Sequence, residues 1–453
     1  MASPIYATAD SMPFSPTGTG ANHALKGIIL VGGPSVGTRF RPLSLDCPKP
    51  LFPIAGQPMI YHHVSALAKL PGMREILVVG FFENSVFDRF LTEVQLEFPT
   101  VPIRYLREYQ ALGTGGSLFH FRDQIIRGDP DQLFVLNADI ATSFPLTDMI
   151  KTHAKHGGVA TLLANRVDRS LVSKYGCVVA DPETKEVLHF VEKPESGLSD
   201  LISCGIYLFN REIFDVMRRA LQERQAKIAD SGYDDSIARG GAEKFMLEQD
   251  VLILLTSAKK LYTHICHPTK DFWMQIKTGS SVIPANRMYL QHFLHAAPRK
   301  LSNAPKPNLN DLTNLTTGGN TTATVIQPAY IHPTAVLHPT AKLGPNVSIG
   351  PRVLLGRGVR VRDAILLDSV EVKNDSCVLN SVVGWDSKIG SWCRVEGAPG
   401  ESNALNATLK GYKIPSATIL GKDVTVHDEI AIRNCIVLPH KDIKTSQHNE
   451  ILM

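Results

Sequence analysis

The chain has 453 residues, a formal net charge of +4 at pH 7 and seven cysteines. This length predicts two domains with substantial hydrophobic cores. The small net charge and the lack of a dense Lys/Arg run argue against a nucleic-acid partner. The cysteines are odd in number, scattered and without a C-x-x-C pair, which favours reduced thiols in a cytoplasmic protein over disulfides or a zinc site. No apolar run reaches membrane-spanning length, so we expect no membrane insertion.

The first part of the chain reads as a tail followed by an α/β domain. Residues 1–23 are rich in Ser, Thr, Pro and Gly and nearly uncharged, which predicts a disordered tail. Over residues 24–295, short apolar runs alternate with helical patterns, which predicts a Rossmann-like α/β domain with a mostly parallel sheet. The expected elements are a helix over Met59–Lys69 and strands over Ile28–Val31, Ile76–Val79, Ile103–Leu106, Leu133–Leu136, Ala160–Leu163 and Ile206–Phe209.

A glycine-rich stretch follows the first expected strand, at the sheet edge where ligands bind in such domains. Its glycines allow backbone N–H groups to approach phosphate oxygens, which its cations would neutralise. A glycine turn with solvated cations is a second interpretation. A P-loop is a third, although Thr38-Arg39 stands where that motif requires Lys-Ser/Thr. The residues singled out are Gly32, Gly33, Gly37, Thr38, Arg39, Arg41, Pro48, Lys49 and Pro50.

Three later positions suggest further ligand contacts. Asp139 follows an apolar strand, a placement suited either to Mg²⁺ or to a helix N-cap. Lys193 follows an expected strand over His189–Val191 and is either a ligand-facing cation or part of a surface turn. A second glycine-rich turn precedes an expected helix near Leu118–Ile126 and would offer backbone contacts to a base or phosphate. This turn consists of Gly113, Thr114, Gly115 and Gly116.

Histidines and tryptophans give weaker signals. His62 and His63 are adjacent on the first expected helix and point about 100° apart, so we expect one to be packed and the other exposed. Trp273, Trp385 and Trp392 are expected in a core or an interface.

The C-terminal part carries an internal repeat. Residues 296–325 are dense in Asn, Thr, Pro and Gly and predict a linker. Within 326–453, aliphatic residues recur at every sixth position, a period that no amphipathic helix has and that a left-handed parallel β-helix of hexapeptide repeats requires. Residues 397–413 interrupt the repeat and should protrude as a loop. The repeat positions are Ile331, Leu337, Leu343, Ile349, Leu355, Val361 and Leu367, then Val383, Ile389, Val395, Leu420, Val426 and Ile432.

Several motifs together resemble the GDP-mannose pyrophosphorylases, a family of sugar nucleotidyltransferases, from about residue 25 to the C-terminus. The first glycine stretch fits the family signature G-G-x-G-T-R-x-x-P-L…P-K-P, with Pro34-Ser-Val36 in place of one residue. Strings such as Gly37-Thr-Arg-Phe-Arg-Pro-Leu43 look like the α-type subunit. The other matching strings are Leu112-Gly-Thr-Gly-Gly116, Asn137-Ala-Asp139, Glu192-Lys-Pro194, Cys204-Gly-Ile-Tyr207 and Ser381-Val-Val-Gly-Trp385.

The family joins mannose 1-phosphate to GTP, giving GDP-mannose and pyrophosphate. By resemblance, Arg39 and Lys49 would face the triphosphate, and Asp139 would bind Mg²⁺. Lys193, Ser203 and Gly205 would contact the sugar or its phosphate. The nucleotide would lie against Gly32, Gly33, Gly37, Thr38, Gly113, Thr114, Gly115, Gly116 and Asp139.

The chain departs from the family pattern at the expected metal site. Active relatives carry a W-M-D-I-G-like string whose Asp is the second Mg²⁺ ligand, whereas Trp273-Met274 is followed here by Gln275-Ile276-Lys277. A neutral amide does not balance a divalent cation as a carboxylate does. Ser203 also stands where relatives tend to have Asn, and the glycine loop is two residues longer.

These departures lead us to expect an α-type regulatory subunit that binds GDP-mannose or GTP. It would modulate a catalytic β-type homologue and assemble with it through the β-helices. One alternative is an active mannose-1-phosphate guanylyltransferase that uses Asp139 alone for Mg²⁺. Another is a structural scaffold whose pocket has decayed.

Overall fold

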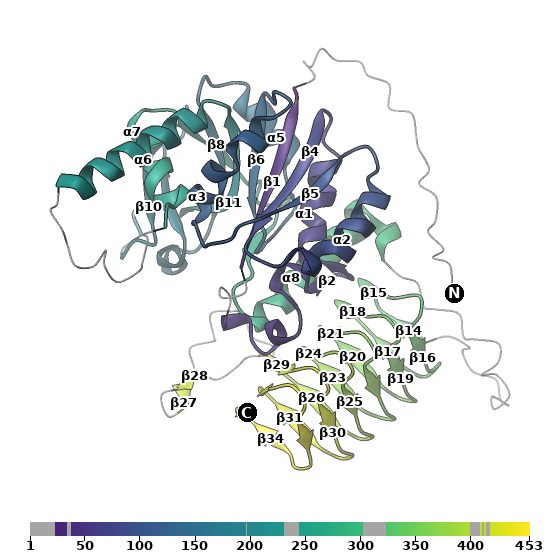
Figure 1. The fold of residues 1–453 in the computed structure, drawn as a ribbon. Helices are drawn as coiled ribbons and strands as arrows, with labels where there is room; N and C mark the ends of the chain where they lie inside the picture. Colours follow the sequence, from purple (N-terminus) through teal and green to yellow (C-terminus); the bar gives the residue numbers. More distant parts are fainter. Residues whose placement is uncertain are drawn as a thin grey trace.

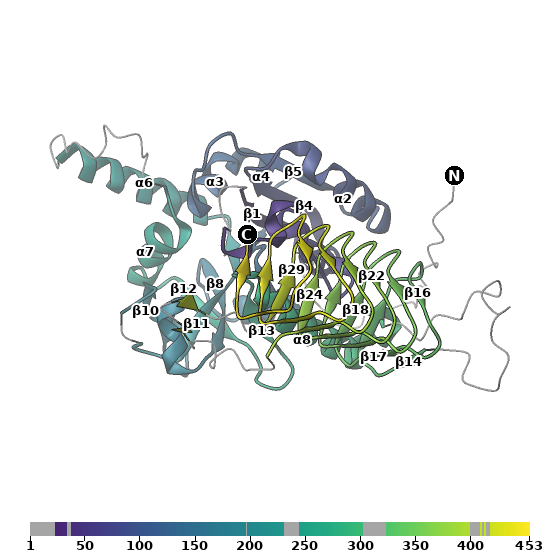
Figure 2. The same ribbon diagram turned by 90° about the horizontal axis from the view of Figure 1, so that it is seen from below.

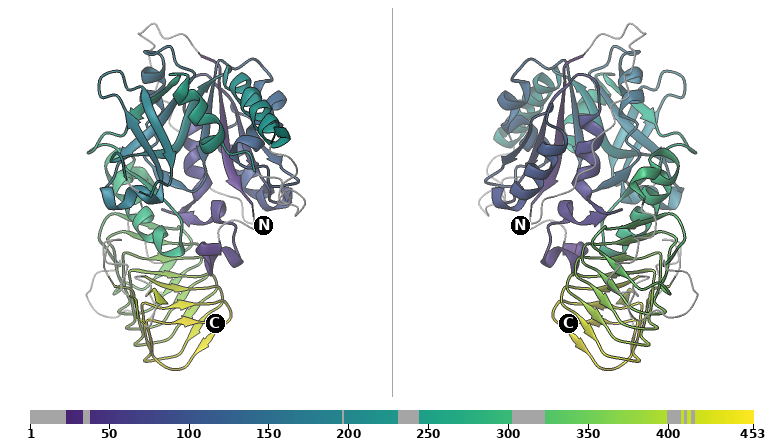
Figure 3. Two further views of the ribbon diagram at one scale, coloured as in Figure 1. Left: turned by 90° about the vertical axis from the view of Figure 1, so that its left-hand side faces the viewer. Right: turned by 90° about the vertical axis from the view of Figure 1, so that its right-hand side faces the viewer.

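A sheet domain and a β-helix stacked beneath it make up the chain (Figures 1 and 3). The computed structural model describes residues 23–33, 38–195, 197–230, 244–301, 323–398, 408–409, 412–413 and 417–453. Almost all of the predicted tail, most of the predicted linker and loop, and the extra residues of the first glycine stretch lie outside these ranges. In the described part of the chain, no helix combines the length and the apolar character that a membrane crossing requires.

The first domain is built on a nine-stranded sheet whose core is parallel. The core order is β5 (Ile103–Arg107), β4 (Met73–Gly80), β1 (Leu25–Gly32) and β6 (Gln132–Asn137). Antiparallel to β6 runs β11 (Leu201–Asn210), which joins this core to β8 (Ala160–Arg166), β9 (Gly176–Ala180), β10 (Val187–Glu192) and β12 (Leu261–Ile265). Each of the six predicted strands lies within one of these, which confirms the predicted α/β fold.

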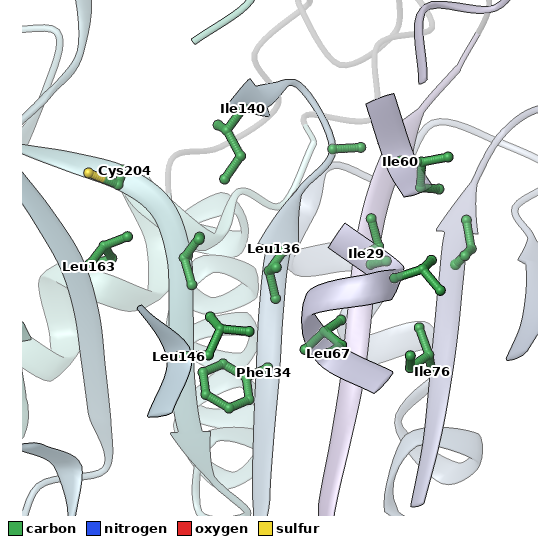
Figure 4. Close-up of a cluster of buried hydrophobic side chains, with 14 of the residues drawn as sticks. Ile29, Ile60, Leu67, Ile76, Phe134, Leu136, Ile140, Leu146, Leu163 and Cys204 are labelled. Carbon is green, nitrogen blue, oxygen red and sulfur yellow. The ribbon is translucent and has the colours of Figure 1, made fainter. Parts of the chain in front are cut away.

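Helices cover both faces of the sheet because successive strand side chains point to opposite sides. Ile29 belongs to a core with α1, α2 and α5, whereas Ile28 belongs to a core with α3, α4, α6 and α7. Figure 4 shows the first core, where Ile29 of β1 and Leu136 of β6 lie near Leu67 of α1. The helices are α1 (Met59–Ala68), α2 (Asn84–Glu97), α3 (Thr114–His120), α4 (Arg122–Ile126), α5 (Leu146–His153), α6 (Ile213–Asp230), α7 (Leu252–Ser257) and α8 (Val282–Ala296).

Two helix predictions have different outcomes. The helix expected over Met59–Lys69 is confirmed as α1. The helix expected near Leu118–Ile126 is present but divided, because α3 ends at His120 and α4 begins at Arg122, on either side of Phe121.

The second domain is a coil of short strands arranged in three parallel sheets, the arrangement of a left-handed β-helix. Figure 2, seen from below, shows its stacked coils. One sheet contains β14 (Thr324–Val325), β17 (Lys342–Leu343), β20 (Arg360–Arg362), β23 (Cys377–Leu379), β26 (Arg394–Glu396), β31 (Ala431–Arg433) and β34 (Gln447–His448). The second contains β15 (Ala329–Ile331), β18 (Val347–Ile349), β21 (Ile365–Leu366), β24 (Ser381–Val383), β29 (Thr418–Leu420), β32 (Ile436–Val437) and β35 (Ile451–Leu452). The third contains β16 (Val336–Leu337), β19 (Leu354–Leu355), β22 (Glu371–Val372), β25 (Lys388–Ile389), β30 (Thr425–Val426) and β33 (Asp442–Ile443).

The prediction that Leu367 continues the six-residue series of interior side chains is wrong. Val361 faces the interior, but the next interior member of this series is Leu366 rather than Leu367. One residue is missing from this coil, since Lys342 pairs with Arg360 but Arg360 pairs with Cys377. Within a strand, a one-residue slip turns each side chain to the opposite face. Leu367 therefore lies on the outer face and packs against the first domain.

The two domains share a hydrophobic interface. It joins α8, β2 (Pro53–Ile54) and β3 (Gln57–Pro58) to the outer face of the sheet that contains β18 and β21. Asn286 of α8 is buried at its centre. Its Oδ1 accepts hydrogen bonds from the Ala55 N–H at 2.8 Å and from the Ser348 hydroxyl at 2.6 Å. This one side chain therefore satisfies polar groups of both domains.

We predict that Asn286→Ala lowers the free energy of unfolding by about 2–3 kcal/mol, because it leaves buried donors of Ala55 and Ser348 without an acceptor. Urea unfolding of the full chain measures the change. The matched control is Arg287→Ala, which removes a partly exposed ion pair with Asp363 and should cost less than about 1 kcal/mol. Equal effects of the two substitutions would contradict the role given to Asn286.

Candidate functional site

The site forms where two parallel strands end side by side. Gly32 ends β1 and Asn137 ends the neighbouring β6, two residues before Asp139. Next to Asp139, β7 (Ile140–Thr142) pairs antiparallel with β13 (Trp273–Gln275), with Gln275 opposite Ile140. The Ile276 N–H donates to the Asp139 carbonyl at 2.8 Å. Strand pairing thus holds Gln275 beside Asp139.

The Asp139 carboxylate is already held by donors of the chain. The Lys49 ammonium lies 3.1 Å from its Oδ2. The Gln275 amide Nε2 lies 3.4 Å from Oδ1 and 3.3 Å from Oδ2. Among the described residues, no group of three His, Cys, Asp or Glu side chains could hold a metal ion. The residues present here do not fit the Mg²⁺ site that the family resemblance implies.

Three further cations lie within electrostatic reach of one another, and Asp139 acts on one of them, Lys277. Lys193 has a left-handed backbone, with φ of 48°, and its ammonium is 2.8 Å from Glu192 Oε1. Lys277 is half-buried, and burial lowers its pKa. Asp139 acts on that pKa in the raising direction, while Lys193 and Arg39 lower it. Asp139, Lys193 and Arg39 are therefore close enough to act on the Lys277 ammonium. Arg39 itself is exposed.

The second glycine turn has partners within the chain. The Gly115 and Gly116 N–H groups donate to the Phe245 carbonyl at 3.1 and 2.9 Å. A Cβ on Gly115 would come within 2.9 Å of the Phe245 ring. The Thr114 hydroxyl donates to Glu248 Oε2 at 2.8 Å. In this structure the glycines therefore serve close packing against residues 244–248, and the two N–H groups predicted for nucleotide contact are engaged.

A polar network continues from Thr114 toward the residues expected to bind the sugar. The Tyr207 hydroxyl is 3.4 Å from both Glu248 Oε1 and the Ser203 hydroxyl. Burial raises the pKa of Glu248. Gly205 has φ of 73°, and a Cβ there would lie 2.8 Å from the Asn137 amide nitrogen. Ser203 and Gly205 thus stand beside the site, while Gly37 lies outside the described residues.

Two residues of this arrangement were not singled out from the sequence as binding residues. Lys277 follows β13 and occupies the position where the family string has glycine, so this substitution was an available signal. Glu248 has no such signal, because it is a single carboxylate in a helical turn (Leu247–Val251) far along the chain from Thr114.

The prediction that one histidine of the pair is exposed is wrong, since both are buried. His62 stacks on Tyr289, with ring centroids 4.0 Å apart. His63 Nε2 lies 3.1 Å from the carbonyl of Asn137, close to the site. Burial lowers the pKa of His62 to about 3 and that of His63 to about 4. Of the tryptophans, Trp273 is buried and Trp385 packs at the domain interface, whereas Trp392 is exposed.

Comparisons with known proteins give matches to both domains. A family model described as "Nucleotidyl transferase" matches residues 26–291, and one described as "GMPPB C-terminal domain" matches residues 325–452. The chain is 47% identical to "Mannose-1-phosphate guanylyltransferase regulatory subunit alpha-A" of Danio rerio, over 95% of this chain and 100% of the relative. It is 44% identical to "Mannose-1-phosphate guanylyltransferase regulatory subunit alpha" of Homo sapiens, with the same coverage. "Mannose-1-phosphate guanyltransferase alpha-A" of Xenopus laevis is 45% identical, again over 95% and 100%.

The buried histidines predict an acid-sensitive fold. Their folded pKa values lie below the ordinary 6.5, so their contribution is fully present above about pH 6.5 and is lost as pH falls toward 4. For His63 the loss amounts to about 3 kcal/mol. Unfolding by urea at pH 7, 6, 5 and 4 measures it.

A His63→Gln variant should make this pH dependence shallower, because the glutamine side chain does not titrate while His62 still does. The control is His189→Gln at an exposed strand position, which should leave the profile as in the parent chain. A parent profile that does not fall between pH 6.5 and 4 would contradict the prediction.

Proposed function

The chain belongs to the family of mannose-1-phosphate guanylyltransferase α subunits, and we propose that it acts as a regulatory subunit within it. It binds GDP-mannose or GTP beside Asp139 and modulates GDP-mannose synthesis by a catalytic β-type homologue. The observation that carries the proposal is the Asp139 carboxylate, which is engaged by Lys49 and Gln275.

The charges of the site favour binding over turnover. Nucleotidyl transfer depends on positioned charge that stabilises the transition state at the phosphate. Here Gln275 supplies no negative charge for a divalent cation, so the site lacks the carboxylate pair of the active family pattern. Arg39, Lys49 and Lys193 remain at family positions and suit phosphate oxygens as binding partners. A phosphate-bearing ligand can therefore be bound where catalysis is weak or absent.

Assembly is the second part of the proposal. The zebrafish and human relatives are named as regulatory subunits, which supports a catalytic partner for this chain. We place the contact on the β-helix. There Trp392 is 65% exposed in the single chain, and tryptophan is enriched among residues that dominate binding at protein interfaces. A cytoplasmic location, expected from the reduced thiols, is part of the same proposal.

An active mannose-1-phosphate guanylyltransferase is the alternative, and two observations favour it. Arg39, Lys49, Asp139 and Lys193 occupy the family's positions. The Xenopus laevis relative carries the enzyme's name without the word regulatory.

We predict that the purified full chain binds GDP-mannose in a calorimetric titration but forms no GDP-mannose from GTP, mannose 1-phosphate and Mg²⁺. The reason is that phosphate-binding cations are present while the second carboxylate is replaced by Gln275. Turnover at ordinary enzymatic rates would establish the alternative. Failure to bind any sugar nucleotide would leave only a structural scaffold.

Restoring the carboxylate should restore a metal site. We predict that Gln275→Asp strengthens Mn²⁺ binding at least about tenfold, because two carboxylates then face one position. Electron paramagnetic resonance of free Mn²⁺ measures this without relying on activity. The matched control is Gln291→Asp, at an exposed position of α8, which should leave Mn²⁺ binding unchanged. An equal response of both variants would refute the role given to Gln275.

A further inference from the structure

We infer that Lys277, acting with Lys49, holds the diphosphate of the sugar nucleotide, and that this chain therefore binds its ligand without a divalent cation. The inference rests on the proposed function, since it concerns the same site. It goes further by assigning a binding residue and by removing the metal from ligand recognition.

Backbone contacts aim Lys277 at the site. Ile276 is fully buried, and its N–H is bonded to the Asp139 carbonyl. In an extended segment, the side chains of residues i and i+2 project from the same side. Gln275 and Lys277 flank Ile276 in this way and are both half-buried. Gln275 reaches the Asp139 carboxylate, and the same carboxylate acts on the Lys277 ammonium.

The Lys277 ammonium is anchored on one side and keeps donors for a ligand. It donates to the Lys174 carbonyl at 2.8 Å and lies 4.4 Å from the centroid of the Tyr175 ring. An ammonium group carries three N–H donors, so two are left for ligand oxygens. The Tyr175 carbonyl accepts a hydrogen bond from the backbone N–H of Lys193 at 3.0 Å. One short segment thus positions Lys277 together with the cation expected to face the sugar phosphate.

The balance of charge fits a diphosphate. Lys49 is paired with Asp139 and Lys193 with Glu192, while Arg39 and Lys277 have no carboxylate contact among these residues, which leaves a surplus of two positive charges. A sugar nucleotide carries about two negative charges on its diphosphate, and ammonium and guanidinium groups bind such oxygens by charge-assisted hydrogen bonds. The cations of the chain are therefore sufficient to neutralise the ligand.

A divalent cation has no comparable place in this arrangement. Both oxygens of Asp139 are contacted by N–H donors, from Lys49 and from Gln275. A metal ion at this carboxylate would compete with these donors and would lie beside the Lys49 ammonium. The Lys49 ammonium already balances the charge of the Asp139 carboxylate. No metal ion is needed for that balance.

Calorimetric titration of the full chain with GDP-mannose, once in excess EDTA and once in excess Mg²⁺, tests the inference. We expect the two dissociation constants to agree within about twofold. Lys277→Met should raise the dissociation constant in EDTA by about tenfold or more, since a charge-assisted hydrogen bond is lost. Lys277→Arg should recover part of the affinity. Lys373→Met, at an exposed position of the β-helix, is the control and should bind as the parent chain does.

The outcomes separate this inference from the proposed function. Binding that requires Mg²⁺, or that Mg²⁺ strengthens tenfold, overturns the metal-free site while the regulatory proposal stands. Unchanged binding by a folded Lys277→Met variant overturns the role of Lys277. Absence of binding in both buffers overturns the proposed function itself. The comparison of EDTA with Mg²⁺ uses the parent chain, so it decides the metal question even if a variant fails to fold.

Discussion

The contact between the Lys49 ammonium and the Asp139 carboxylate is the interaction on which the site depends. Asp139 is only partly exposed, and a carboxylate in such surroundings needs a counter-charge. Here the counter-charge is a side chain of the protein, and the Gln275 amide contacts the same oxygens. The arrangement keeps the cations to which we assign phosphate binding, while it offers a single, already paired carboxylate to a metal. In the proposed function, recognition of a sugar nucleotide and loss of turnover thus have one physical origin.

Both domains contribute to the position of the Lys49–Asp139 contact. Parallel pairing of β1 with β6 brings Gly32, at the end of β1, to the edge of the sheet where Asp139 lies, and pairing of β7 with β13 adds Gln275. Lys49 lies three residues before Phe52, which is fully buried at the domain interface. The Phe52 ring meets Trp385 of the β-helix with centroids 6.0 Å apart. The segment that carries Lys49 is therefore packed directly against the domain to which we assign assembly.

Regular periodicity made most of the architecture predictable. The strands of the sheet core and the hexapeptide coils follow from local patterns of apolar residues. The errors concern contacts between distant segments or single-residue changes of register. Leu367 faces outward because one coil lacks a residue, and His63 is buried because α1 lies against the end of β6. Pairing of Gly115 with Phe245, and the approach of Lys277 to Asp139, depend on long-range packing that no local pattern contains.

The most direct test is the anomalous scattering of Mn²⁺ in crystals of the full chain grown with GDP-mannose and Mn²⁺. We predict ligand density beside Lys49 and Lys277, with Lys49 still paired with Asp139. We also predict no anomalous peak at coordination distance, about 2 Å, from the Asp139 oxygens. A well-occupied Mn²⁺ peak between Asp139 and the diphosphate, with Lys49 displaced, would contradict the conclusion that the chain supplies this charge itself.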